Sequence, residues 1–408
     1  MSKERVFTEK QEEMIRMLKR GELRRLNILE GSVSSGKTWI SLVLWALWVA
    51  CGPEDAGYIM VAKTITSLRR NVLMLLESLV GARNFTVSLT QKEARLFGRL
   101  VFLEGASDAR AENKIRGMTL RGAYCDEITL FSEDFFNMLL SRLRVEGAKL
   151  IGTTNPDNPN HWLMENYLKR ADKLDLLTVN FTIDDNTFLP REYVKNLKKE
   201  FSGMFYERFI LGKWVLADGL VYGMFKPEYV SEEVPRILEY YVGIDYGQSN
   251  ATVFLLAGLG EDERLYIIDE YYHNGKKEQS PKSPYAYAND FIEWVRGNDV
   301  SRLGCIYYDP SALGFRAQLA ELGVGGLKAA NNDVLCGIQI ISAMFDKGLI
   351  RISPRCKHFV DEIYGYAWDT KSAKVGKDKP CKENDHVMDA FRYLVMGKFS
   401  YWKNRLGS

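Results

Sequence analysis

The stretch that decides the fold is "GSVSSGKT", residues 31–38, which fits the pattern G-x-x-x-x-G-K-[ST]. The preceding residues 24–30, "RRLNILE", have the apolar content of a short strand. The following residues 38–50, "TWISLVLWALWVA", predict a helix that ends before Gly52-Pro53. A strand, a glycine-containing loop and a helix in this order surround phosphate groups with backbone N–H donors and a helix N-terminus. The sequence therefore predicts an α/β domain with a P-loop and a mainly parallel sheet.

Within this loop, Lys37 would neutralise the β- and γ-phosphates of ATP, and Thr38 would ligate the accompanying Mg²⁺. The residues predicted to bind the nucleotide here are Gly31, Ser32, Ser34, Ser35, Gly36, Lys37 and Thr38.

A second requirement of P-loop chemistry is an acid for the metal and a base for water. The segment 121–130, "RGAYCDEITL", supplies Asp126 and Glu127 after a short strand expected at Ala123–Cys125. Asp126 would complete the Mg²⁺ shell and Glu127 would orient the attacking water. An acidic pair at a solvated strand end is the alternative, and the P-loop upstream favours the catalytic interpretation.

Small polar residues end the next strand, in "KLIGTTNPDNPNHW" at residues 149–162. Thr153, Thr154 and Asn155 would lie beside the nucleotide if the strand belongs to the same parallel sheet, because ligands bind at the carboxyl ends of such strands. Taken alone, the run Asn-Pro-Asp-Asn-Pro favours a plain turn.

The bulk composition is that of an ordinary globular protein with more than one domain. The chain has 408 residues, 46% hydrophobic and 26% charged, with a formal net charge of +2. A nucleic-acid surface would therefore need local clusters of positive charge. The six cysteines show no CxxC spacing, which disfavours a zinc ribbon. The charged N-terminus has no signal-peptide pattern, and no apolar run is long enough to span a membrane.

The second half begins with three successive strands, followed by alternating helices and strands. Asp245 lies inside the first strand, Asp309 ends a later strand in "CIYYDPS", and Asp389 lies on a final helix. This order of elements is that of a ribonuclease H-like domain with a mixed sheet, in which the three acids meet at one sheet edge. We predict a P-loop domain at residues 1–235 and a ribonuclease H-like domain at 236–408.

Clustered carboxylates suit Mg²⁺ or Mn²⁺, and two ions about 4 Å apart would support phosphodiester cleavage. His386, three residues before Asp389, shares its helical face. Alternatives stay open for the neighbouring acids. Asp309 could start a turn before Pro310, and Glu270 could be a further ligand or an exposed strand end. We expect Asp385 to cap the last helix.

A lysine-rich segment directly precedes this helix and is a candidate DNA-binding loop, because phosphate neutralisation drives non-specific duplex binding. A solvated mobile loop is the alternative, and Arg69 and Arg70 are a second candidate DNA contact. The five lysines are Lys371, Lys374, Lys377, Lys379 and Lys382.

Taken together, "GSVSSGKT", "IRGMTLRGAYCDEITL", "IGTTNPDNPNHWL", "FILGKWVLADGLVYGMF", "GIDYGQSNATV", "CIYYDPSA" and "KENDHVMDAFRY" resemble, in order and wording, the large terminase subunits of tailed bacteriophages. The resemblance implies that Thr153–Asn155 couple hydrolysis to movement and that Gln11 contacts adenine, although Gln11 could equally belong to a helix cap. It also implies an arginine finger acting across subunits, at Arg116 or else Arg121. His386 matches a family histidine that could act as ligand, proton shuttle or positioning group.

The resemblance further implies an ATP-driven motor that moves double-stranded DNA into a procapsid, and a metal-dependent endonuclease that cuts concatemeric DNA. The implied partners are DNA, a small terminase subunit and the portal of the procapsid, with a homo-oligomeric ring in the host cytoplasm and no membrane. Two alternatives stay open. One is a P-loop helicase or repair ATPase fused to a nuclease, and the other is an assembly protein with degenerate sites.

Overall fold

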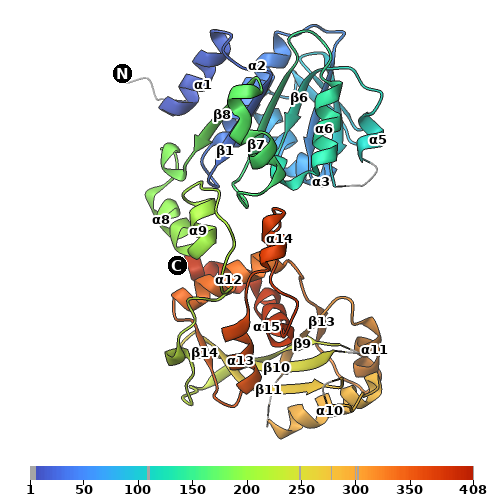
Figure 1. Ribbon diagram of the computed structural model, residues 1–408, viewed down its shortest axis with the longest axis vertical. Coiled ribbons are helices and arrows are strands. Elements are labelled where there is room, and N and C mark those ends of the chain that lie inside the picture. The colour runs from blue at the N-terminus through green and yellow to red at the C-terminus, as the bar shows by residue number, and fades with distance from the viewer. Residues whose placement is uncertain are drawn as a thin grey trace. The chain divides into compact units, whose positions relative to one another are not determined.

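The computed structural model describes residues 6–107, 111–247, 250–276, 278–298, 300 and 303–407. The chain forms two compact units, each built on its own sheet (Figure 1). The first unit contains the residues up to 194 together with 204–216 and 374–377, and the second contains 195–203, 217–373 and the residues from 378. The boundary at residue 235 stays a proposal for where the second fold begins.

The strands of the first unit are β1 (Leu26–Gly31), β2 (Gly57–Ala62), β3 (Phe85–Ser88), β4 (Glu93–Leu96), β5 (Arg99–Gly105), β6 (Leu120–Cys125), β7 (Lys149–Thr154) and β8 (Leu176–Phe181). Its helices are α1 (Glu9–Lys19), α2 (Lys37–Ala50), α3 (Ile65–Leu68), α4 (Met74–Val80), α5 (Ala111–Ile115), α6 (Glu133–Arg142) and α7 (Trp162–Asn166). The helices α8 (Arg191–Glu200) and α9 (Gly203–Phe209) follow in the chain.

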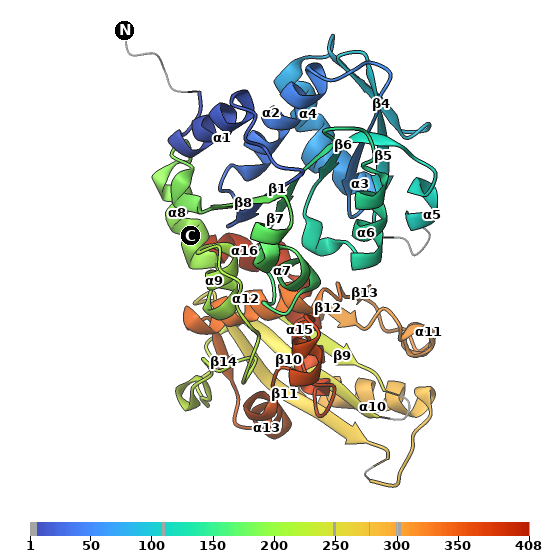
Figure 2. The same ribbon diagram turned by 45° about the horizontal axis from the view of Figure 1, so that its top comes forward.

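The eight strands have the order β3-β4-β5-β2-β6-β7-β1-β8, and all pairs from β5 to β8 are parallel. β1 pairs with β7 on one side and with β8 on the other, and Figure 2 shows the three strands close together. Consequently β7 separates the P-loop strand β1 from β6, the strand that precedes Asp126. The carboxyl ends of β1, β6 and β7 share one edge of the sheet, which is where ligands bind in such folds.

Alternating side chains bury both faces of this sheet, as a parallel sheet requires. Leu29, Met60 and Tyr124 point into a core formed with α1, α2 and α4. Their neighbours Ile28 and Ile59 point into the opposite core, formed with α5, α6 and α7. β6 starts at Leu120 and is therefore longer than the strand of three residues expected from the sequence.

The strands of the second unit are β9 (Ile237–Asp245), β10 (Ala251–Gly260), β11 (Leu265–Asn274), β12 (Leu303–Tyr308), β13 (Leu327–Ala329) and β14 (Ile350–Ile352). Its helices are α10 (Pro284–Gly297), α11 (Leu313–Glu321), α12 (Val334–Asp346), α13 (Lys357–Gly365), α14 (Thr370–Lys374), α15 (His386–Gly397) and α16 (Phe399–Gly407).

The second sheet has the order β13-β12-β9-β10-β11-β14. β9, β10 and β11 form an antiparallel meander, while β12 pairs parallel to β9 and β13 parallel to β12. Three meandering strands extended by two parallel strands beside the first are the ribonuclease H-like topology. The predicted fold class, a P-loop domain followed by a ribonuclease H-like domain, is confirmed.

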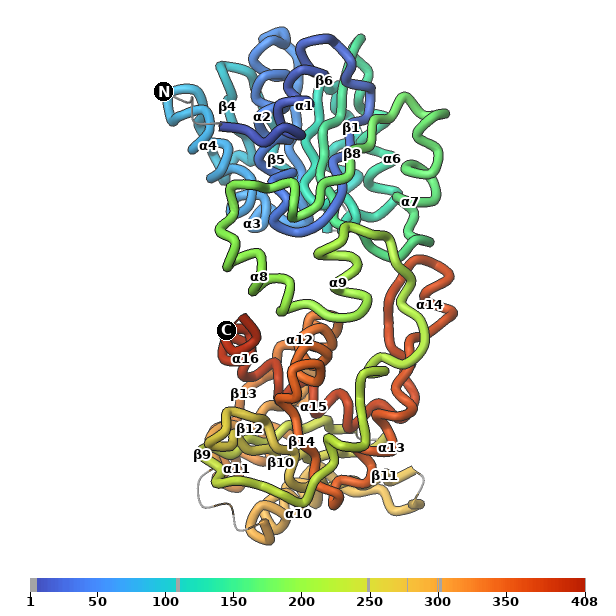
Figure 3. The backbone as a smooth tube through the Cα atoms, turned by 90° about the vertical axis from the view of Figure 1, so that its left-hand side faces the viewer, coloured from blue at the N-terminus to red at the C-terminus, as the bar shows by residue number. Residues whose placement is uncertain are grey.

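Helices cover both faces of the second sheet. α10 and α11 pack on one face through Tyr287, Phe291 and Phe315, and α15 packs on the other face across β9 and β10 (Figures 1 and 3). At this crossing a Cβ on Gly243 of β9 would lie 2.2 Å from the carbonyl oxygen of Ala390, so only glycine permits the approach. The glycine therefore determines how closely α15 carries its polar residues to the sheet.

The apolar helix α2 is an internal helix, as its sequence predicted. Leu42, Leu44 and Trp45 are fully buried in the first unit. Among the described residues, none of the helices combines the length and the apolar content needed to cross a membrane.

Candidate functional site

The loop between β1 and α2 adopts a conformation that depends on its glycines. Gly31 and Gly36 have φ angles of +133° and +83°. A Cβ on Gly31 would lie 1.8 Å from the carbonyl oxygen of Phe181, and one on Gly36 would lie 2.7 Å from the amide of Gln11. The two glycines of the motif therefore allow the tight turn and the close packing of the loop.

Two hydroxyl groups of this loop are buried without a partner among the described residues. They belong to Ser32 and Ser35. Gly36, at the N-cap of α2, provides no side-chain cap, and Thr38 lies half-buried in the first turn. Unsatisfied buried groups at a helix N-terminus indicate a site for an anion. The loop thus has the donors that a phosphate group requires.

Lys37 lies at the centre of this arrangement with only 4% of its surface exposed. Its Nζ donates to the carbonyl oxygen of Ser32 at 3.0 Å and to Oδ1 of Asn155 at 2.6 Å. Burial lowers the pKa of Lys37, and the charges of Glu127 and Asp126 oppose that shift. The amine is therefore held between the loop and the strand end of β7.

The two acids lie at the carboxyl end of β6. Oδ1 of Asp126 accepts a hydrogen bond from the hydroxyl group of Thr153 at 3.1 Å. Burial, and then the charge of Glu127, raise the pKa of Asp126 to about 6, against the hydrogen bond from Thr153 and the charge of Lys37. A cation beside this buried carboxyl group would favour its ionised form.

Asn155 joins the second acid to the lysine. Its backbone N–H and its side-chain amide donate to Oε2 and Oε1 of Glu127, both at 3.1 Å, while its Oδ1 accepts from Lys37. Glu127 itself has a φ of +56°, a left-handed conformation that aims its carboxylate at Asn155. Thr154 contacts Thr129 at 3.0 Å. Thr153 and Asn155 thus contact the acids directly, and Thr154 supports the loop that follows them.

Gln11 contacts the loop and also belongs to a helix cap, so both interpretations of this residue apply. Its side-chain amide donates to the carbonyl oxygen of Gly36 at 3.3 Å, and its Oε1 accepts from the N–H of Thr8 in the capping box of α1. Two further contacts to the loop had no signal in the sequence. Asn186 donates to the carbonyl oxygen of Ser34 at 2.8 Å, and the hydroxyl of Tyr193 lies 3.0 Å from that of Ser34.

The two candidate arginines lie away from the loop. Arg116 is exposed just after α5, and its carbonyl oxygen accepts a hydrogen bond from Arg142. Arg121, near the amino end of β6, lies 5.2 Å over the ring of Trp48. Within the described residues neither side chain forms a hydrogen bond or ion pair with the loop. Both arginines lie toward the amino end of β6, whereas Asp126 follows its carboxyl end, and Arg116 is the more exposed of the two.

The second polar site lies at one edge of the ribonuclease H-like sheet. Tyr308 of β12 pairs with Ile244 of β9 in parallel register, so Asp309 and Asp245 follow at the same end of adjacent strands. α15, which crosses β9 at Gly243, brings His386 and Asp389 to them. Residues separated by more than 140 positions in the chain thereby meet.

Asp245 is buried at the end of β9. Its Oδ2 lies 2.9 Å from Nδ1 of His386, and this contact raises the pKa of His386. Burial raises the pKa of Asp245 to about 6; the hydrogen bond with His386 lowers it, and the charges of Asp389 and Asp309 raise it further. Asp309 and Asp389 are therefore both close enough for their charges to act on Asp245.

The other two acids each have protein partners. Asp309 accepts hydrogen bonds from the hydroxyl of Tyr393 at 2.7 Å and from the N–H of Ser311 at 2.6 Å. Burial alone would raise its pKa, but these hydrogen bonds outweigh burial and the pKa is lowered. Oδ1 of Asp389 accepts from Arg392 at 2.6 Å and Oδ2 from Lys382 at 3.1 Å.

Among the described residues, no three His, Cys, Asp or Glu side chains are arranged closely enough to hold one metal ion. The chemistry of the set nevertheless fits a hard divalent cation. All three members offer oxygen ligands, the charges of Asp389 and Asp309 act on Asp245, and the cationic side chains of Lys382 and Arg392 already contact Asp389.

Two acidic residues prove to be helix caps. Glu270 accepts hydrogen bonds from the N–H groups of His358 and Phe359 at the start of α13, which favours a structural role over a ligand. Glu362, which sequence reasoning missed, accepts from the N–H groups of Val387 and Met388. The prediction that the side chain of Asp385 caps α15 is therefore wrong. Asp385 stands at the N-cap position, but its side chain forms no cap hydrogen bond because Glu362 takes that place.

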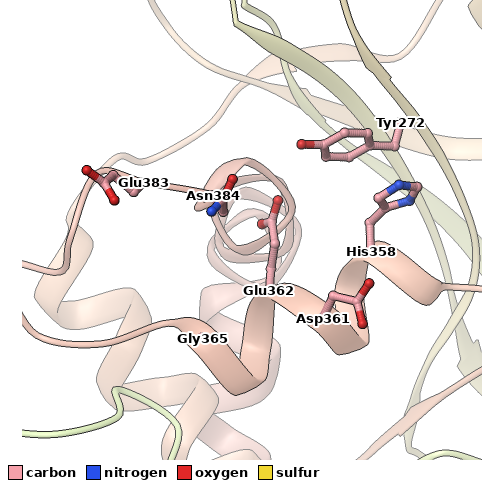
Figure 4. Close-up of a pocket in the computed structure, with 7 residues that line it drawn as sticks. All are labelled: Tyr272, His358, Asp361, Glu362, Gly365, Glu383 and Asn384. Carbon is pink, nitrogen blue, oxygen red and sulfur yellow. The ribbon is translucent and has the colours of Figure 1, made fainter. Parts of the chain in front are cut away.

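Glu362 also lines a pocket of about 240 Å³ between α13 and the segment before α15. Figure 4 shows its carboxylate beside Asn384, with the rings of Tyr272 and His358 stacked at the other side, 4.1 Å apart between centroids. Burial raises the pKa of Glu362 to about 7, although its two backbone hydrogen bonds oppose the shift. The pocket adjoins the acid site through residues 383 and 384.

The five predicted lysines are all exposed. A bridge between Trp368 and Pro380, and a hydrogen bond from the N–H of Asp369 to the carbonyl oxygen of Lys379, close the segment that carries the first four lysines, of which Lys371 and Lys374 lie on α14. Lys382 differs from the other four because it contacts Asp385 and Asp389.

Comparison with known proteins gives concordant results. A family model described as "Terminase large subunit, T4likevirus-type, N-terminal" matches residues 28–226. The large terminase subunit of Escherichia phage T5 is 28% identical over 160 residues, which cover 38% of this chain and 35% of that protein. The chain thus spans about a third of the length of the curated relative that it matches.

The solved structures extend the similarity to nearly the full length. The large terminase of a thermophilic bacteriophage is 34% identical, with a TM-score of 0.86 over 96% of this chain and 98% of that one. The same phage protein in complex with ATP-γ-S matches at 34% identity and a TM-score of 0.83, over 95% and 98% of the two chains. Because this similarity covers both units, the chain belongs to the family of bacteriophage large terminase subunits.

Proposed function

We propose that this terminase subunit hydrolyses ATP in its first unit to move double-stranded DNA into a procapsid, and cuts concatemeric DNA in its second unit. The observation that carries the motor function is the hydrogen-bonded network of Lys37, Asn155 and Glu127 beside a loop with unsatisfied donors. The structure of the thermophilic phage terminase with ATP-γ-S supports ATP as the nucleotide.

In this proposal, each member of the network has one task. The loop N–H groups and Lys37 hold the β- and γ-phosphates, Thr38 and Asp126 hold Mg²⁺, and Glu127 orients the attacking water. Asn155 accepts from Lys37 through Oδ1 and donates to Glu127 through its amide, so a phosphate that draws Lys37 away would remove one of the two contacts that hold the side chain of Asn155. Thr153 and Asn155 would thereby link the state of the nucleotide to the strand end of β7.

For the second unit we propose a nuclease in which Asp245, Asp309 and Asp389 hold two Mg²⁺ or Mn²⁺ ions. Such a pair of ions activates water and stabilises the leaving oxygen of a phosphodiester. The observation that supports this proposal is that three acids far apart in the chain meet at one sheet edge, where burial raises the pKa of Asp245 and the charges of Asp389 and Asp309 add to that shift. His386 orients Asp245 through its Nδ1, which makes it a positioning residue in this proposal.

Replacing Arg116 with alanine is expected to abolish ATP turnover in the assembled ring while leaving nucleotide binding unchanged. The exposed guanidinium would stabilise the phosphoryl charge in a neighbouring subunit, an effect of about 10³-fold or more for arginine fingers. Turnover and nucleotide affinity are measured on the assembled motor, with Arg121→Ala as the comparison. Near-normal turnover of Arg116→Ala would remove this residue from the site.

The lysine loop is proposed to bind the DNA backbone. Replacing Lys371, Lys374, Lys377 and Lys379 with glutamine together is expected to lower cleavage and to flatten its dependence on salt, because each phosphate contact releases about one counterion. Cleavage is measured across a salt series beside the wild type. An unchanged slope of log activity against log salt would refute the contact.

Packaging itself requires partners that the family implies: a small terminase subunit, the portal of the procapsid and further copies of this chain in a ring in the host cytoplasm. The test is ATP-dependent protection of double-stranded DNA from nuclease digestion inside procapsids. Strand displacement without protection would favour the helicase alternative, and the absence of both ATPase and cleavage activity would favour an assembly protein with degenerate sites.

A further inference from the structure

A lysine side chain lies within the acid cluster of the second unit. Nζ of Lys382 is 3.0 Å from Oδ2 of Asp385 and 3.1 Å from Oδ2 of Asp389. The lysine is close in sequence to both acids, because it directly precedes the segment that leads into α15. It therefore supplies positive charge to the acids from within the same short stretch of chain.

The two cations that contact Asp389 differ in their freedom to move. Arg392 has 1% of its side chain exposed, and a second hydrogen bond of 2.7 Å, to Asn332, fixes its guanidinium. Its stem packs on α12, where a Cβ on Gly337 would lie 2.5 Å from Arg392 Cγ. Lys382, in contrast, has 67% of its side chain exposed. Arg392 is thus a permanent partner of Oδ1, while the partner of Oδ2 can leave.

We propose that Lys382 is an internal counter-ion of the nuclease acids that a divalent cation must displace from Asp389 before the site is active. This inference rests on the proposed nuclease function, because it concerns how that same site is regulated.

The reason is competition for one oxygen atom. Oδ1 of Asp389 already accepts a hydrogen bond from the fixed Arg392, so Oδ2 is the oxygen with the exchangeable partner, and the ammonium group of Lys382 contacts that oxygen. An ammonium and a divalent cation repel each other and cannot occupy the same side of one oxygen. Asp385 provides the displaced lysine with a second carboxylate in the immediate vicinity. Without a metal ion, the ammonium group of Lys382 reduces the repulsion among the acids. When a metal ion binds, the ammonium group leaves Oδ2 of Asp389.

The test is the affinity of the full chain for Mn²⁺, measured by isothermal titration calorimetry without nucleotide or DNA. Lys382→Gln removes the competing charge, Lys382→Arg keeps it, and Lys403→Gln removes one charge from an exposed lysine of the same unit. Each Lys382 variant is also measured in an Asp389→Asn background, so that the coupling between the two positions is isolated.

Lys382→Gln is expected to bind Mn²⁺ about two- to fivefold more tightly than the wild type, the range for losing an exposed ion pair. Lys382→Arg and Lys403→Gln are expected to match the wild type, and the gain should disappear in Asp389→Asn. Equal or weaker binding by Lys382→Gln, beside a wild type that binds Mn²⁺, would overturn the inference and leave the nuclease proposal standing. If neither protein binds Mn²⁺ at the acids, the inference and the metal site both fail.

Discussion

Replacing Lys37 with alanine is expected to reduce the rate of ATP turnover by about 10²–10³-fold, the usual cost of removing one buried electrostatic stabiliser of a transition state. The expectation follows from the position of Lys37, which is buried, donates to the loop carbonyl of Ser32 and to Asn155, and faces the charges of Asp126 and Glu127. The measurement is the steady-state release of phosphate.

Lys19→Ala is the matched control, because it removes an exposed lysine at the end of α1 in the same unit. It should leave turnover unchanged. Mn²⁺-dependent DNA cleavage by Lys37→Ala should also persist, which would show that the second unit remains folded. Turnover within twofold of the wild type would mean that the loop is not the site of hydrolysis.

Replacing Asp245 with asparagine is expected to lower DNA cleavage at least 100-fold while ATP turnover persists. Asparagine has nearly the same shape and can still accept the hydrogen bond from His386, so the substitution removes the charge and little else. A neutral amide is a much weaker ligand for Mg²⁺ or Mn²⁺ than a carboxylate, and two-metal cleavage needs both ions in place. Cleavage of supercoiled plasmid in Mn²⁺ is the measurement.

Asp346→Asn makes the same change at an exposed position at the end of α12, and it should cleave as the wild type does. Together, Lys37→Ala and Asp245→Asn form a reciprocal pair, in which each variant loses one activity and keeps the other. Full cleavage by a correctly folded Asp245→Asn protein would contradict the assignment of this acid.

Features encoded locally could be predicted from the sequence. The loop at residues 31–38 requires glycine at two positions, and its flanking strand and helix follow from apolar patterning, so β1 and α2 were predicted correctly. The meander of β9, β10 and β11 follows from three apolar runs separated by turn residues. The placement of Asp245 and Asp309 on adjacent strands follows from that fold class.

Features that depend on packing between distant elements could not be predicted. Glu362 caps α15 only because α13 packs beside the start of that helix, and this displaces Asp385 from the role that its N-cap position suggested. Asn186 and Tyr193 contact the loop at Ser34 from more than 150 residues away. Lys382 is exposed and looked like its four neighbours in sequence, and only the turn before α15 brings its amine to Asp389.

The most direct test of the two-metal nuclease site is anomalous diffraction from a crystal of the full chain soaked in Mn²⁺. We predict two anomalous peaks about 4 Å apart, enclosed by the carboxylates of Asp245, Asp309 and Asp389. Saturating Mn²⁺ with no peak at these three acids, or with peaks only elsewhere in the chain, would contradict the account.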